Sequence, residues 1–418
     1  MTSYLQQRTL YPPLIQNKPS LNLGIIVVIP AYDEANLLFS LMALKKCSLP
    51  SCDVEVLVVV NDSESDPVEV KYRNDSVAQK AREWALQQND SRLKFHILRH
   101  SGLPKMHAGV GLARKIGMDE ACWRFEKAGN QHGIIACFDA DSRCDSNYFL
   151  ALADHFDSFP ETQACSIYFE HPLESIDFDD SIYEAIILYE LHLRYYIQAL
   201  RYAGFPFATH AIGSAMAVRS DAYQRQGGMN KRKAGEDFYF LHKFTPLGHF
   251  SEIKTTRVMP SPRPSHRVPF GTGKAIVEIM KSKAKFLTYH PQSFEDLKPF
   301  FQTIDSLFFV EKENLPSFLF KLPKSIQAFL SDNQFEEKVS EIQANTAGPD
   351  TFQNRFFRWF NAFMVMKYLH FARDSFYENS PVEEAAGWLL KKYSSKNFGQ
   401  ENLSARQLLV QFRKMDKK

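Results

Sequence analysis

The chain lacks the features that mark membrane, secreted and fibrous proteins. Its 418 residues include no uninterrupted apolar run of about 18 residues, so we expect no membrane-spanning helix. Residues 1–20 contain no basic segment followed by a long apolar one, and we therefore expect no signal peptide. With 44% hydrophobic and 23% charged residues, the composition is typical of a globular protein, and the length fits two or three domains.

Cysteine is scarce and the net charge is small. The six cysteines are Cys47, Cys52, Cys122, Cys137, Cys144 and Cys165. They include no C-x-x-C pair and no histidine at metal-binding spacing, which argues against a zinc site and against a disulfide framework. We therefore expect free thiols in a reducing compartment and a cytoplasmic location. The formal net charge of +2 argues neither for nor against nucleic-acid binding, and we expect no nucleic-acid partner.

What the sequence does contain is an alternation of apolar runs and amphipathic segments between residues 24 and 171. The runs expected to form buried strands are 24–30, 54–62, 93–100, 133–141 and 164–171. The segments expected to form helices are 34–47, 76–89 and 106–129. Strands that alternate with helices predict an α/β fold, with a mostly parallel sheet flanked by helices.

Polar residues follow three of the expected strands. They are Pro30-Ala31-Tyr32, Asn61-Asp62 and Asp139-Ala140-Asp141. In α/β sheets, ligands bind beyond the carboxyl ends of the strands, so this edge is the expected site. The acidic end of the stretch ACFDADSRCD is the most informative, because Asp139 and Asp141 repel each other unless a cation lies nearby. The alternative is a surface turn, in which aspartate is common.

The later part of the chain has a different character. Residues 181–203 predict a long helix whose tyrosines face a core. Residues 204–274 are rich in Gly, Pro and polar residues, which is typical of loops. A helix that is apolar nearly all round is expected over 351–377, buried in a core or covered by a partner. The expected divisions are an N-terminal extension (1–23), a main domain (24–275) and a largely helical C-terminal region (276–418).

Five motifs occur in the order found in one known family. They are VVIPAYDEANLL (27–38), VLVVVNDSESD (56–66), HAGVGLARKIGMDEA (107–121), CFDADSRCDSNYF (137–149) and GSAMAVRSDAYQRQGGMNKRKAGEDFYF (213–240). On these motifs, residues 24–275 resemble the glycosyltransferases of family 2, which have the GT-A fold. The resemblance implies a Rossmann-like sheet and a metal-dependent transfer of a sugar from a nucleotide-diphosphate sugar to an acceptor hydroxyl, with inversion. The C-terminal region has no counterpart in the minimal family pattern.

The resemblance also implies which residues bind the nucleotide sugar. They are Pro30, Ala31, Tyr32, Glu34, Asn61, Asp62, His107, Arg114, Asp139, Gly213 and Ser214. Asn61 or Asp62 would accept a hydrogen bond from the base. The alternative for Asp62 is an Asx-turn that closes the strand. Arg114 would pair with phosphate oxygens, for which a guanidinium fork is well shaped, and the next residue, Lys115, would add a cation beside the diphosphate or face solvent. Gly109 and Gly111 would let the backbone approach the diphosphate.

A metal site follows from the same resemblance. Asp139, Asp141 and His266 would hold Mn²⁺ or Mg²⁺, which stabilises the charge that builds up on the leaving diphosphate. The alternative for His266 is a loop histidine that only bonds to backbone. Arg263 and Arg267, on either side of it, would then be free to contact phosphate.

Two neighbouring acids are the expected catalytic residues. By resemblance Asp237 is the base that removes the proton from the acceptor hydroxyl, and Glu236 orients the acceptor or supports the loop. The alternative is a helix N-terminus that carries acids because the helix dipole favours them. The basic run Lys231-Arg232-Lys233 belongs either to a mobile loop over the diphosphate or to a solvated surface.

Other functions stay open at this point. They are a retaining GT-A transferase of the glyceryl-glycoside type, a nucleotidyltransferase, and a non-catalytic module that binds nucleotide sugars. A nucleotidyltransferase needs a Gly-rich basic loop after the first strand, which PAYDEANLL lacks. The expected donor is a UDP-sugar, with a GDP-sugar as the alternative, and the acceptor is a glycan, a lipid-linked molecule or a small molecule. The C-terminal helices would support a homo-oligomer or contact with the inner face of the membrane.

Overall fold

The computed structural model describes residues 1–267, 271–282, 284–393 and 403–418. The chain divides into two compact units. We call residues 1–178 and 211–275 the sheet unit, and residues 179–210 and 276–418 the helical unit. The long helix α6 (Asp180–Ala203) therefore groups with the helical unit, although the sequence places it within the main domain.

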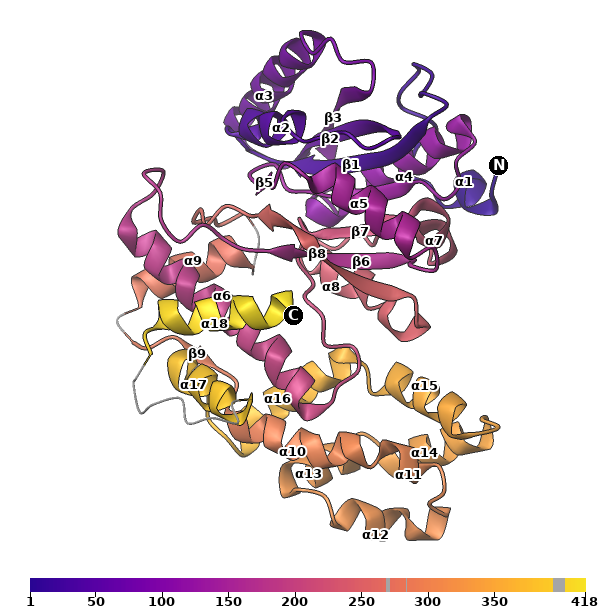
Figure 1. Cartoon of the computed structure of the whole chain (residues 1–418), viewed down its shortest axis with the longest axis vertical. Helices are drawn as coiled ribbons and strands as arrows, with labels where there is room; N and C mark the ends of the chain where they lie inside the picture. Colours follow the sequence, from indigo (N-terminus) through magenta and orange to yellow (C-terminus); the bar gives the residue numbers. More distant parts are fainter. Residues whose placement is uncertain (268–270, 283, 394–402) are drawn as a thin grey trace. The chain divides into compact units, whose positions relative to one another are not determined.

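The sheet unit is built on a mixed sheet (Figure 1). Within the described residues, eight strands lie in the order β3-β2-β1-β4-β7-β6-β8-β5. Their bounds are β1 (Leu23–Ala31), β2 (Asp53–Ser63), β3 (Leu93–Leu103), β4 (Ile134–Cys137), β5 (Arg143–Cys144), β6 (Ala164–Phe169), β7 (Met216–Arg219) and β8 (Phe250–Met259). Strands β3, β2, β1 and β4 are mutually parallel, and β7 is antiparallel to both β4 and β6. The α/β prediction is confirmed.

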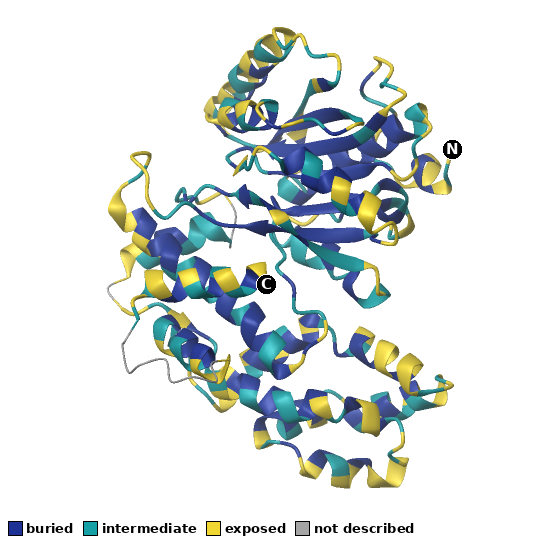
Figure 2. Cartoon of the chain, in the orientation of Figure 1, coloured by how far each residue is buried: buried dark blue, intermediate teal, exposed yellow. Residues whose placement is uncertain are grey.

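Helices pack around this sheet. They are α1 (Ser3–Gln7), α2 (Leu37–Lys45), α3 (Val68–Leu86), α4 (Val110–Ala128), α5 (Tyr148–Ser158), α7 (Ser220–Arg225) and α8 (Glu236–Leu241). The residues of β1 from Ile25 to Ile29 are fully buried, as expected of a strand covered on both faces (Figure 2). Gly117 of α4 lies against Val28 and Val59, where an added methyl group would clash, so α4 packs closely on β1 and β2.

The segment 204–274 holds more regular structure than its composition indicates. Strands β7 and β8 and helices α7 and α8 all fall within it, so the expectation of loops was wrong for these parts. Strand β7 has only four residues, and its pairing with β4 and β6 makes it a strand. Such tertiary pairing leaves little local signal in a short apolar run.

The N-terminal residues are anchored on α4. The Tyr4 hydroxyl donates to Asp119 Oδ1 (2.7 Å) and accepts from Lys115 Nζ (2.9 Å). The backbone amides of Leu14 and Ile15 donate to the carboxylate of Glu120. Lys115 is buried in this contact, so it neither faces solvent nor provides a cation beside a diphosphate.

The helical unit contains α6 and most of the C-terminal helices. They are α9 (Thr272–Lys281, which begins in the sheet unit), α10 (Pro291–Gln302), α11 (Ile304–Leu307), α12 (Leu315–Phe320), α13 (Lys324–Asp332), α14 (Phe335–Ala344), α15 (Pro349–Trp359), α16 (Ala362–Ser375), α17 (Val382–Tyr393) and α18 (Ala405–Lys417). Two short strands, β9 (Leu287–Thr288) and β10 (Ser380–Pro381), pair antiparallel. No helix among the described residues is long and apolar enough to cross a bilayer.

The single helix expected over 351–377 is two helices. The break lies at Phe360-Asn361, where the Asn361 side chain accepts hydrogen bonds from the amides of Phe363 and Met364 and so caps α16. An asparagine N-cap provides an alternative to helix continuation that the apolar pattern alone hides. Phe356 of α15 and Phe360 at the break pack with Phe300 and Phe329 in the aromatic core of this unit.

Helix α18 is held on α6 by buried charges. Asp416 accepts hydrogen bonds from Arg194, from Gln198 (2.5 Å) and from His210 (3.0 Å). Glu190 accepts from Arg194 (2.7 Å) and from Arg413 (2.8 Å). The docking of the last helix therefore depends on paired charges as well as on apolar contact.

Candidate active site

The sheet brings the three polar strand ends to one edge. Strands β1, β2 and β4 run parallel, with Ala31 opposite Val60 and Val28 opposite Cys137 in the ladders. The polar residues that follow each strand therefore lie at neighbouring positions. This is the edge at which open α/β sheets bind ligands.

Arg114 is the centre of the first part of the site. Its guanidinium donates to Asp139 Oδ1 (2.5 Å), at the end of β4, and to Glu236 Oε1, at the start of α8. Arg114 is only 2% exposed, and Glu236 is buried as well. A buried carboxylate and a buried guanidinium each cost much free energy alone, so this pairing fixes both side chains. Arg114 therefore links α4 to the start of α8, 122 residues further along the sequence.

The backbone of Gly213 packs against this guanidinium. A methyl group added at Gly213 would lie 2.5 Å from both terminal nitrogens of Arg114. A residue with any side chain at this position would displace the guanidinium from its carboxylates. The next residue, Ser214, is buried, and its hydroxyl has no hydrogen-bond partner within the part of the chain that the structure describes.

Asp237 follows Glu236 in the first turn of α8. It accepts a hydrogen bond from the amide of Phe238 (2.7 Å), and Asp139 and Arg114 both act on it electrostatically. Burial raises the pKa of Asp237 above its ordinary value, Asp139 raises it further, and Arg114 opposes the shift. A carboxylate with a raised pKa is a better proton acceptor near neutral pH.

Two glycines at the start of α4 approach another loop of the protein. An added methyl group at Gly109 would meet the backbone of Lys233, and one at Gly111 would meet the backbone of Arg232. The Gly111 amide also donates to the Arg232 carbonyl (3.2 Å). Arg232 stacks on the ring of Tyr239, 3.8 Å from its centroid. The basic loop is therefore packed onto the start of α4, and the close approach that these glycines allow is to this loop.

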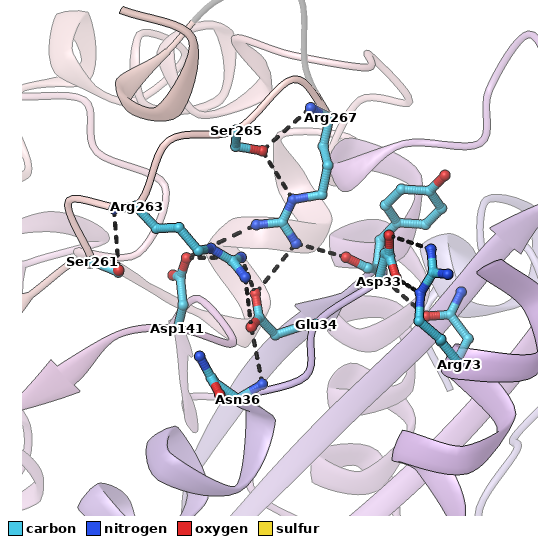
Figure 3. Close-up of polar contacts among 11 residues, drawn as sticks. Asp33, Glu34, Asn36, Arg73, Asp141, Ser261, Arg263, Ser265 and Arg267 are labelled. Carbon is cyan, nitrogen blue, oxygen red and sulfur yellow. Dashed lines mark hydrogen bonds and ion pairs between the residues drawn. The ribbon is translucent and has the colours of Figure 1, made fainter. Parts of the chain in front are cut away.

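The second part of the site contains Glu34 and two arginines (Figure 3). Arg263 donates to both carboxylate oxygens of Glu34, and Arg267 donates to Glu34 Oε2 (3.3 Å) and to the Tyr32 carbonyl (2.7 Å). Arg263 Nη2 also lies 3.5 Å from Asp141 Oδ2, and Arg267 Nη2 lies 4.0 Å from it. The segment after β8 thus brings two guanidinium groups to the acids at the ends of β1 and β4.

Asp141 has two carboxylates and two guanidinium groups as charged neighbours. Burial raises the pKa of its carboxyl group, and so do the nearby carboxylates of Asp139 and Glu34, while Arg263 and Arg267 lower it; the result is a pKa of about 7. About a quarter (25%) of the side chain stays exposed. A carboxylate whose pKa is raised by burial gains from an additional cation or from a hydrogen-bond donor.

The three expected metal ligands are not gathered around one point. Among residues 1–267, 271–282, 284–393 and 403–418, no three His, Cys, Asp or Glu side chains are placed to hold a metal ion. His266 is exposed, and it lies between Arg263 and Arg267 in the sequence. Mg²⁺ and Mn²⁺ are commonly held by one or two carboxylates together with substrate phosphates. Asp141, whose pKa is raised by burial and by two nearby carboxylates, fits that simpler donor set.

The end of β2 is tied to its neighbour β3. Asp62 is fully buried, and its carboxylate accepts hydrogen bonds from Arg99, from Ser101 Oγ (2.9 Å) and from the Gly102 amide (2.8 Å). Although burial alone raises it, these donors hold the pKa of Asp62 below its ordinary value. Asn61 is also buried, and its carbonyl accepts from Asn74 Nδ2 (3.1 Å).

The remaining predicted residues lie on the same edge or near it. Pro30 and Ala31 end β1, and Tyr32 follows them, with a hydroxyl whose pKa burial raises to about 12. Asp33 adopts a left-handed backbone (φ 49°), which aspartate tolerates, and Arg73 and Asn74 of α3 hold it (Figure 3). His107 lies in the loop between β3 and α4, where its amide donates to the Pro104 carbonyl (2.9 Å).

Three arginines belong to the site in ways that the motif comparison did not assign. Arg263 and Arg267 were expected to contact phosphate only in the alternative in which His266 binds no metal. The family motifs give Arg99 no role. The feature that points to Arg99 is its place in β3. It lies opposite Val60, the residue that precedes Asn61. The signal for the pair is the presence of two arginines in a Pro- and Ser-rich segment that follows a strand.

Comparisons with known proteins give a distant likeness in structure alone. No family model matches the chain, and no curated protein sequence matches it. Among solved structures, S. aureus TarS 1–349 in complex with UDP-GlcNAc has a TM-score of 0.41 and 14% identity, over 81% of this chain and 92% of that one. The same TarS fragment in complex with UDP has a TM-score of 0.37 and 13% identity, over 71% and 78%. Likeness at this level assigns no activity to this chain, so we argue function from its own residues.

Proposed function

We propose that this chain is a GT-A glycosyltransferase that moves a sugar from a nucleotide-diphosphate sugar to an acceptor hydroxyl. The observation that carries the proposal is the buried Arg114, which joins Asp139 at the end of β4 to Glu236 at the start of α8. Two acidic motifs far apart in the sequence thereby become one constellation at the ligand-binding edge of the sheet. The family-2 motifs that these residues carry support the same proposal.

The diphosphate would lie beside Arg263 and Arg267. Both guanidinium groups converge on Glu34 and Asp141, and guanidinium forks match phosphate oxygens well. On binding, phosphate oxygens would take over part of the hydrogen bonding that Glu34 now provides. Asp141 would hold the divalent cation, Mn²⁺ or Mg²⁺, which when bound stabilises the negative charge of the leaving diphosphate.

Asp237 would accept the proton of the acceptor hydroxyl. Its pKa is raised by burial, which suits a base that works near neutral pH, and the nearby Arg114 opposes the rise. Glu236 would act by holding Arg114, and through it Asp139, in place. A base positioned on the side away from the leaving diphosphate gives inversion at the anomeric carbon. Ser214, whose buried hydroxyl has no partner among the described residues, would bond to the donor sugar.

Donor turnover tests this proposal. The full chain would be incubated with UDP- and GDP-sugars and Mn²⁺ or Mg²⁺, and the release of nucleoside diphosphate would be measured with and without EDTA. We expect turnover of one donor class, loss of turnover with EDTA, and a strong decrease in Asp237→Asn with donor binding retained. Binding of a nucleotide sugar without any turnover, with acceptors of the glycan, lipid-linked and small-molecule classes present, would indicate a binding module. A product that keeps the anomeric configuration of the donor would show a retaining enzyme and remove Asp237 as the base.

A further inference from the structure

Two of the six cysteines lie next to each other in the sheet unit. Cys47 follows α2 and Cys144 lies in β5, and their Sγ atoms are 3.5 Å apart although the residues are 97 positions apart in the sequence. Both are free thiols in the structure. Cys47 is buried and Cys144 is partly exposed.

The backbones on both sides hold the two thiols in this position. The Ser48 amide donates to the Ser146 carbonyl (2.8 Å), which joins the segment after α2 to the segment after β5. Cys47 Sγ also lies within hydrogen-bond distance of the Ala43 carbonyl (3.4 Å) and the Asp145 carbonyl (3.7 Å). Because an S–S bond is about 2.05 Å long, the sulfur atoms need to approach by only about 1.5 Å to form one.

The other cysteines have a different environment. Cys122, Cys137 and Cys165 are fully buried, and burial raises the pKa of each thiol. Cys47 differs from them, because the hydrogen bond from Cys144 and a backbone amide hold the pKa of its thiol below the ordinary value in spite of burial. The thiolate is the reactive form in thiol–disulfide exchange. Cys47 therefore has a thiol whose pKa is lowered and also lies next to a second thiol, that of Cys144.

We propose that Cys47 and Cys144 form a redox-active pair that is oxidised reversibly by small disulfides. The Cys47 thiolate attacks one sulfur of a small disulfide RSSR, whose S–S bond breaks as RS⁻ leaves. The Cys144 thiolate then attacks the Cys47 sulfur of the mixed disulfide and expels the second RS⁻. The two protons lost by the protein thiols are taken up by the leaving thiolates. In total, two protein thiols and one RSSR become one protein disulfide and two RSH.

A disulfide between Cys47 and Cys144 would fix the backbone beside the turn that contains Asp139 and Asp141. Cys144 comes three residues after Asp141, and Ser40 of α2 already donates to the Ser142 carbonyl (2.7 Å). Oxidation would therefore link the end of α2 covalently to the segment that leaves the turn. A cross-link over so long a loop restricts the unfolded chain, so the oxidised protein should melt several degrees higher than the reduced one. The pair does not depend on the proposed function.

The test is peptide mapping of the full chain after incubation at graded ratios of oxidised to reduced glutathione. Free thiols would be blocked with N-ethylmaleimide before digestion. Trypsin cuts after Lys46 and Arg143, so Cys47 shares a peptide with Cys52 and Cys144 shares one with Cys165. The double variant Cys52→Ser/Cys165→Ser leaves a single cysteine in each of the two peptides and makes the assignment unique. It also serves as the control for replacing cysteines that lie outside the proposed pair.

We expect one intramolecular cross-link in the wild type and in the double variant, and its reversal by excess reduced glutathione. Cys47→Ser and Cys144→Ser should lose the cross-link and the oxidation-dependent rise in melting temperature. If either single variant does not fold, the double variant decides the question alone. An absence of the cross-link at every glutathione ratio, a link between two chains, or a link that persists in Cys144→Ser would overturn the proposal.

Discussion

The backbone of Gly213 lies directly against the guanidinium of Arg114, and a methyl group at residue 213 would come within 2.5 Å of both terminal nitrogens. The guanidinium cannot simply move aside, because Asp139 and Glu236 hold it. Gly213 is therefore part of the site through the arginine that it supports. No motif comparison reveals this relationship, since the two residues are 99 positions apart in the sequence.

Gly213→Ala should weaken both the fold and the site. Overpacking against a fixed guanidinium is expected to cost about 1–3 kcal/mol of unfolding free energy, measured by urea denaturation. Donor turnover should decrease as well, because Arg114 would leave its carboxylates. Gly387→Ala is the matched control, since an added methyl group there meets nothing within 4 Å. A Gly213→Ala protein with wild-type stability and turnover would show that Arg114 can shift at no cost.

Replacing the arginines beside Asp141 should weaken the binding of nucleoside diphosphate. A hydrogen bond to a charged group contributes about 1.5–3 kcal/mol, so Arg263→Gln or Arg267→Gln should each lower the affinity for UDP about 10- to 100-fold, measured by calorimetry. Arg73→Gln is the matched control, because Arg73 pairs with Asp33 near this cluster without contacting Glu34 (Figure 3). Equal losses in all three variants would point to a general charge effect instead of phosphate contacts.

The sequence predicted the strands that carry the site and the polar residues that follow them. Runs such as GIIVVIP are strongly apolar and β-branched, and β1 forms where they indicate. The acidic turn, the Asn61-Asp62 pair and Tyr32 all follow strands, and parallel pairing brings them to one edge without further information. This part of the site follows from the alternation of strands and helices.

The partners within the site could not be predicted in the same way. Arg114 was expected to contact phosphate, whereas its guanidinium bonds to Asp139 and Glu236. Lys115 was expected at the surface or near phosphate, and it is buried against Tyr4 and Asp119. Ion pairs between distant segments leave no periodic pattern in the sequence, because either partner alone looks like an ordinary surface charge.

Asp62 offers a test of base recognition against a structural role. Its carboxylate already accepts from Arg99, Ser101 and Gly102, so Asp62→Ala should cost about 3 kcal/mol of unfolding free energy, as the loss of one partner of a buried ion pair does. Stability would be followed by urea denaturation, and the preference between UDP and GDP by calorimetry. If Asp62 reads the base, the variant should change that preference while its stability stays near that of the wild type.

The charges that hold α18 on α6 predict an acid-sensitive contact. Burial alone raises the pKa of Asp416, but His210, Arg194 and Gln198 outweigh it and hold the pKa well below its ordinary value. A lowered pKa in the folded state gives stability that is complete above about pH 4 and is lost as the pH falls below it.

The corresponding comparison is between the wild type and Asp416→Asn. At pH 7 the urea midpoint of the variant should lie clearly below that of the wild type, and the gap should narrow as the pH falls from about 4 toward 2. Arg201 also faces this carboxylate and stays charged over the whole range, so it does not change the direction of the effect. A gap that is the same at pH 7 and at pH 3 would mean that the charge of Asp416 does not stabilise the contact.

Equilibrium binding of nucleotide sugars tests the central claim most directly. Calorimetric titrations of the full chain with UDP-, GDP- and TDP-sugars, each with Mn²⁺ and with Mg²⁺, would be compared with those of Asp141→Asn. We expect saturable binding of one nucleotide class, strengthened by the divalent cation, and loss of that strengthening in the variant. If no nucleotide sugar binds in the presence of either cation, this edge of the sheet is not a nucleotide-sugar site and the proposed function is wrong.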